Sequence, residues 1–173
     1  MNNSLFFNLV NNLSKNIFFV ISIFFLINIE VSLGVFLIFN TATPSLVSII
    51  LFLVIKKFNY IPSNLNLIFI GLLNDIFLGN NLGLNSIFFL LFKYLIENIN
   101  INIADKEYKE DWLYFTLIFI ISFTVILLIN MLLNLKIPDF GPILYYLGIT
   151  LITFPILNFS INSFYFIQRL FKS

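Results

Sequence analysis

The chain has 173 residues, of which 60% are hydrophobic and only 10% are charged, and its mean hydropathy is +1.03. Soluble domains are about 45–50% apolar and about 25% charged, so this composition excludes an ordinary soluble protein and predicts a single membrane domain. The net charge of +1 argues against nucleic-acid binding, and the absence of cysteine and histidine excludes disulfides, thiol chemistry and the commonest metal ligand.

The apolar pattern predicts an all-α integral membrane protein with six transmembrane helices. Residues 1–16 are expected to form a cytoplasmic N-terminal tail, residues 17–168 a six-helix membrane domain, and residues 169–173 a cytoplasmic C-terminal tail. The predicted spans are 17–39, 44–57, 65–78, 84–98, 112–133 and 143–166.

Prolines and charges mark the limits of these segments. Pro44 is expected at the first position of the second helix, where the missing N–H of proline leaves no hydrogen bond unmade. The second and third helices are short for a crossing of about 20 residues, and tilt or shelter by neighbouring helices would accommodate them. Residues 100–111 form the charged loop, and Pro155 predicts a kink in the sixth helix.

The distribution of basic residues predicts the orientation in the membrane. Six crossings place both termini on one side, and eight of the nine Lys and Arg residues then lie on that side, with Lys136 the exception. Because basic residues are retained on the cytoplasmic side, both termini are expected in the cytoplasm.

A glycine–aspartate motif, made of Gly71, Asp75, Gly79 and Gly83, is the most specific pattern in the chain. The first three residues are four apart and are therefore expected on one helix face, where small residues let a second backbone approach. Gly79 and Gly83 flank a polar turn at residues 80–81 between two helices. A carboxylate in lipid is costly, so Asp75 is either a packing residue hydrogen-bonded to another helix or an ion-coupled site.

Two further ionisable residues lie inside predicted spans. Glu30, in the first span, either pairs with Lys93 or lies near the outer interface in contact with water. Lys93, in the fourth span, is expected to extend to the inner interface, with an ion pair to Glu97 one turn later. Asn130 and Asn158 are expected to form hydrogen bonds between helices.

No catalytic pattern accompanies these residues. Glu30 and Asp75 are expected in the outer halves of two helices, as an acid–base pair would require. The sequence has no nucleophile motif, phosphate-binding loop or cluster of metal ligands beside them. We therefore expect no enzymatic activity, no cofactor and no metal.

The order of features resembles the rod shape-determining protein MreD family. The resemblance is carried by Thr43-Pro44, a short apolar helix, a basic connector and the glycine–aspartate motif. The length, the six-span layout and Pro155 agree with it.

The resemblance implies a non-enzymatic protein of the bacterial inner membrane that maintains rod shape and supports lateral peptidoglycan synthesis. It implies direct binding of MreC, and association with MreB, RodZ and the elongation glycosyltransferase and transpeptidase within the whole complex. It also implies contact with membrane lipids and a bundle similar to the S components of energy-coupling-factor transporters.

The S components supply a second hypothesis, in which the chain binds a vitamin and docks a coupling subunit. This hypothesis predicts a polar, aromatic-lined cavity that opens to the outside. The outer loops, at residues 40–43, 80–82 and 135–142, are short and poor in ligand-type residues. This shortage favours the scaffold hypothesis.

Overall fold

Six helices make up the regular structure of the described chain. The computed structural model describes residues 3–34, 42–58, 60–98, 108–135 and 138–170. All regular elements among these residues are α-helices, which confirms the all-α class. They are α1 (Asn3–Leu33), α2 (Leu46–Phe58), α3 (Asn64–Leu78), α4 (Leu84–Asn98), α5 (Tyr108–Asn134) and α6 (Phe140–Leu170).

Three of these helices are long and apolar enough to cross a membrane. The stretches are Asn16–Leu33 in α1, Glu110–Asn134 in α5 and Phe140–Ile161 in α6, and most of their residues are not buried within the protein. By contrast, α2, α3 and α4 have 13, 15 and 15 residues. At 1.5 Å per residue these lengths correspond to about 20–23 Å, less than the roughly 30 Å of a hydrocarbon core.

The long helices extend beyond the predicted spans. α1 begins at Asn3, so the segment expected as a separate N-terminal tail continues the first helix without a break. α5 begins at Tyr108, inside the expected charged loop, and α6 ends at Leu170. The predicted ends were set by hydropathy, which shows only where the apolar residues stop. The hydrogen bonds of a helix can continue into the polar residues beyond that point. Residues 35–39 of the first span and most of the charged loop lie outside the described residues.

The start of α2 also differs from the prediction. The helix begins at Leu46, so Pro44 precedes it and does not occupy its first position. Ser45 lies immediately before the helix, where its hydroxyl is 2.6 Å from the hydroxyl of Ser48 and its backbone N–H donates to Thr150 Oγ1 of α6 at 3.1 Å. A serine at a helix start supplies a side-chain oxygen that proline lacks.

α2 is the central helix of the molecule. Val47, Ile49, Leu51, Phe52 and Leu53 are all at most 2% exposed, whereas Leu46, Ile50, Val54 and Lys57 are half-buried along one side. The helix packs against α1, α4, α5 and α6. This burial agrees with the expectation that neighbouring helices shelter a short helix.

Phenylalanine side chains fill the space around α2. Phe115 of α5 stacks on Phe154 of α6 with ring centroids 4.3 Å apart, and Phe52 meets these two rings edge-on at 5.5 and 5.7 Å. Phe92 of α4 and Phe119 of α5 extend the cluster. Each aromatic pair contributes about 0.5–1.5 kcal/mol beyond burial, so the cluster fixes the positions of four helices.

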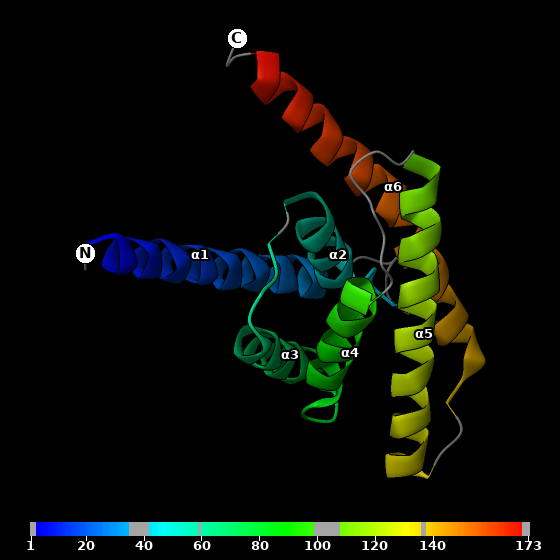
Figure 1. Cartoon of the computed structure of the whole chain (residues 1–173). Helices are drawn as coiled ribbons and strands as arrows, with labels where there is room; N and C mark the ends of the chain where they lie inside the picture. The colour runs from blue at the N-terminus through cyan, green and yellow to red at the C-terminus, as the bar shows by residue number, and fades with distance from the viewer. Residues whose placement is uncertain (1–2, 35–41, 59, 99–107, 136–137, 171–173) are drawn as a thin grey trace.

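The helices do not form a parallel bundle (Figure 1). α3 and α4 lie side by side and pack most extensively, while α5 and α6 cross each other beside them. α1 runs at a steep angle to α5 and contacts α2 and α3, with Phe19, Ile23 and Ile27 as its buried apolar residues. The N-terminal part of α1 therefore projects away from the other helices.

Candidate functional site

Asp75 is the central acceptor of the turn between α3 and α4. Its Oδ2 accepts the backbone N–H of Gly83 at 2.6 Å, and its Oδ1 accepts the backbone N–H and the side-chain amide of Asn85 at 3.2 and 2.8 Å. The backbone N–H groups of Gly83 and Asn85 lie at the N-terminus of α4, where the helix itself provides no acceptor for them. Asp75 is 0% exposed. Its geometry agrees with the interpretation of this residue as a packing residue bonded to a neighbouring helix.

The glycines of the motif do two different things. A Cβ on Gly71 would lie 2.3 Å from the backbone nitrogen of Ser86, so α3 and α4 are in backbone contact there. Gly79 and Gly83 have φ angles of +68° and +94°, and a Cβ on either would meet nothing within 4 Å. The predicted packing role is therefore correct for Gly71 and wrong for Gly79, because both turn glycines supply left-handed backbone instead.

Glu30 caps a second helix. Its Oε2 accepts the backbone N–H groups of Leu46 and Val47 at 3.1 and 3.5 Å, and the residue is 2% exposed. A carboxylate at a helix N-terminus is favoured by both the free N–H groups and the helix dipole. Neither alternative from the sequence is correct, since Glu30 is buried and does not pair with Lys93. Each of the two membrane acids thus holds the start of a different helix.

Lys93 forms hydrogen bonds with the connector between α2 and α3. Its Nζ donates to the carbonyl of Pro62 at 3.0 Å and to Asn64 Oδ1 at 2.7 Å. The predicted ion pair with Glu97 is confirmed at 3.8 Å, with the Glu97 side chain 37% exposed. The role of Lys93 within the described chain is therefore to join α4 to the start of α3.

The same connector is also tied to α1. The Tyr60 hydroxyl donates to Asn16 Oδ1, and the side-chain amide of Asn66 donates to the same atom at 3.3 Å. Burial raises the pKa of the Tyr60 phenol above its ordinary value, so it remains a donor at neutral pH.

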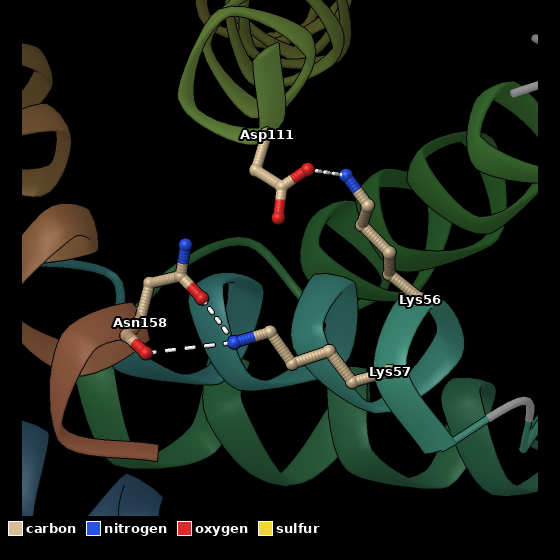
Figure 2. Close-up of polar contacts among 4 residues, drawn as sticks. All are labelled: Lys56, Lys57, Asp111 and Asn158. Carbon is tan, nitrogen blue, oxygen red and sulfur yellow. Dashed lines mark hydrogen bonds and ion pairs between the residues drawn. The ribbon is translucent and has the colours of Figure 1, made fainter. Parts of the chain in front are cut away.

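A polar cluster at the end of α2 joins it to α5 and α6 (Figure 2). Lys56 forms an ion pair with Asp111 of α5, and the two side chains are 3% and 12% exposed. The ammonium of Lys57 points the other way and donates to Oδ1 of Asn158 in α6. These contacts agree with the predicted interhelical role of Asn158.

This cluster was not predicted from the sequence. The second predicted span ends at residue 57, and Asp111 falls at the end of the predicted charged loop of residues 100–111. The sequence pattern that could have predicted the cluster is a pair of lysines at the end of one apolar segment, with acidic residues just before another apolar segment. Because both Lys56 and Asp111 are buried, removal of either leaves an unpaired charge.

A cavity of about 310 Å³ lies where α1 ends and α2, α4 and α6 begin. Glu30 and Asn74 line it on one side, and Asn130 of α5 lines it on another. The aromatic residues Phe88, Phe123 and Tyr146 complete its wall. Most of these side chains come from helices, so the short outer loops do not prevent a polar, aromatic-lined cavity.

Chemically, the described residues of this arrangement offer buried hydrogen-bond acceptors. Glu30 and Asp75 are each engaged with backbone N–H donors, and no cluster of three metal-ligating side chains occurs within the described ranges. No protein-family model, curated protein or solved structure matches the chain. The functional argument therefore depends on the geometry of the helices and the cavity.

Proposed function

We propose that this chain is a non-enzymatic membrane scaffold of the MreD type, a component of the bacterial cell-elongation complex. The observation that carries the proposal is the fixed hairpin of α3 and α4. Asp75 caps α4 within the hairpin and Gly71 brings the two backbones into contact. The glycine–aspartate motif, which is the most specific part of the resemblance to MreD, thus lies within one compact unit.

The hairpin presents an apolar surface to its surroundings. Leu65, Phe69, Leu72 and Ile76 follow one another along α3 at helical spacing and are 37–77% exposed. A single membrane-spanning helix of a partner packs against such a stripe through van der Waals contacts. We assign this stripe to direct binding of MreC, with MreB, RodZ and the elongation glycosyltransferase and transpeptidase joining at the level of the complex.

The proposed setting is the bacterial inner membrane, with six crossings, both termini in the cytoplasm and a bundle related to the S components. The long apolar helices support a membrane location. The burial of α2 supports the inclusion of short helices within the membrane domain.

The test is co-purification with MreC after co-expression in native membranes. We expect MreC to be retained by the unaltered chain, and Asp75→Leu to lower its recovery because the start of α4 loses its cap. Ser160→Leu is a suitable control, since Ser160 is exposed on α6 and bonds only within its own helix. Absence of any association in the native membrane would contradict the proposal.

The cavity favours a second candidate function, the substrate-binding S component of a vitamin transporter. Its volume of about 310 Å³ and its walls of Phe88, Phe123 and Tyr146 fit a small ligand. Tight binding of a vitamin by the purified protein, without recovery of MreC, would decide for this candidate.

A further inference from the structure

The cavity described above has the size of a small-molecule site. Its volume of about 310 Å³ lies at the lower end of the roughly 300–1,000 Å³ found for ligand pockets. The ends of five helices contribute to it, so its shape is set by the packing of the whole molecule. Binding of a ligand in this cavity does not depend on whether the chain acts as a scaffold.

The polar side chains that line the cavity include both acceptors and donors. They are Glu30, Thr43, Ser45, Asn74, Asn80, Asn85, Asn130 and Tyr146. Asn130 Oδ1 already accepts from the side-chain amides of Asn81 and Asn134. The described lining holds the acidic Glu30 and no lysine or arginine, so it suits a ligand that carries positive charge.

Asn74 is the acceptor that lacks a partner. The residue is 4% exposed, and its Oδ1 makes no hydrogen bond with any described part of the chain. A buried acceptor without a donor destabilises the protein, and a bound donor would satisfy it. The adjacent Asp75 does not supply one, because its own oxygens accept from α4.

Aromatic side chains line the same cavity. Phe123 and Tyr146 lie with ring centroids 5.1 Å apart, and Phe88 adds a third ring to the wall. The faces of such rings attract cations within about 6 Å of their centres. The rings and the acceptors therefore favour the same kind of ligand.

We propose that this cavity binds a primary ammonium group, donated either by a free small amine or by the headgroup of a lipid. The ammonium donates a hydrogen bond to Asn74 Oδ1, its charge is opposed by the Glu30 carboxyl group, and the aromatic rings surround its carbon chain.

The test uses the full-length chain in nanodiscs of phosphatidylglycerol, titrated with ethanolamine and followed by ligand-observed NMR. Ethylene glycol is the matched probe, because it replaces the ammonium with a hydroxyl. We expect ethanolamine to bind at least about tenfold more tightly than ethylene glycol, as a charged hydrogen bond would give. Equal affinities for the two probes would overturn the proposal.

Variants of the cavity residues test whether ethanolamine binds in this cavity. Asn74→Leu and Glu30→Gln should each weaken ethanolamine binding at least about tenfold. Glu30→Gln retains an oxygen that caps α2, so its effect separates charge from folding. Asn28→Leu is the control, since Asn28 bonds to Phe24 of its own helix and is not among the lining residues, and it should leave the affinity unchanged. An identical affinity in all three variants would overturn the proposal.

A second experiment distinguishes a free amine from a lipid headgroup as the source of the ammonium. Nanodiscs that also contain phosphatidylethanolamine are analysed by native mass spectrometry. Retention of this lipid by the unaltered chain, with loss in Asn74→Leu, identifies a headgroup as the ligand. Displacement of that lipid by ethanolamine shows that both occupy one site. If neither the lipid nor free ethanolamine binds the unaltered chain better than Asn74→Leu, the proposal is wrong.

Discussion

At the scale of single residues, buried carboxylates act here as helix caps. Glu30 holds the first N–H groups of α2, and Asp75 does the same for α4. In hydrocarbon each unpaired backbone group costs several kcal/mol, so a short helix buried among others needs such a partner. An acid supplied from a different helix satisfies the donors and fixes the positions of two elements together.

Gly71 provides the sharpest residue-scale prediction. We expect Gly71→Ala to lower the free energy of unfolding by about 1–3 kcal/mol, because its Cβ would lie 2.3 Å from the Ser86 nitrogen. Gly148 of α6 is the matched control, since a Cβ there meets nothing within 4 Å. Gly148→Ala should stabilise by about 0.5–1 kcal/mol through better helix propensity. Thermal unfolding in detergent compares them, and equal effects would contradict the close approach.

At the scale of elements, the molecule is arranged around α2. Most of its apolar side chains are buried, its start is capped from α1, and its end is fixed to α5 and α6 by Lys56 and Lys57. A helix of 13 residues is only marginally stable alone, so tertiary contacts maintain it.

The pair of Lys56 and Asp111 yields the element-scale prediction. Because both side chains are buried, Asp111→Leu should cost about 3–5 kcal/mol, and Lys56→Met should cost less, since Lys57 still interacts with Asp111. The double variant should cost less than the sum of the two single variants. The more exposed pair of Lys93 and Glu97 is the control, with an expected coupling below about 1 kcal/mol. A double-mutant cycle of unfolding free energies measures both couplings. A small coupling at Lys56 would show that α2 and α5 are not joined through this pair.

At the scale of the whole molecule, the number of crossings decides the topology. The even number predicted from basic residues places both termini on one side, whereas crossing by α1, α5 and α6 alone would separate them. The chain has no cysteine, so single cysteines can report the side of each position.

We expect Ser14→Cys and Ser173→Cys to react with an impermeant maleimide only from the cytoplasmic side, because eight of nine basic residues are predicted there. Asp139→Cys, at the exposed position just before α6, should react only from the outside. Labelling of intact cells and of inverted vesicles makes the measurement. Opposite labelling of the two termini would support three crossings instead.

The sequence by itself determined the helical class, the approximate position of each helix and the importance of the glycine–aspartate motif. These features depend on local hydrophobicity and on spacing along one helix, which a single chain displays directly. The short turn between Gly79 and Gly83 was also predicted, whereas the left-handed backbone of these two glycines was not.

Only the tertiary structure decided which donors Glu30 and Asp75 accept, why Lys56 and Lys57 are buried, and which residues surround the cavity. The donors to Asp75 lie across the turn that follows α3, whereas the contacts of Glu30, Lys56 and Lys57 join separate helices. α1 and α5 approach the centre from different directions. Hydropathy reports how apolar a helix is, but it does not specify the neighbour against which each face packs. The physical reason is that local preferences favour the helices, whereas packing between helices fixes the partners of their side chains.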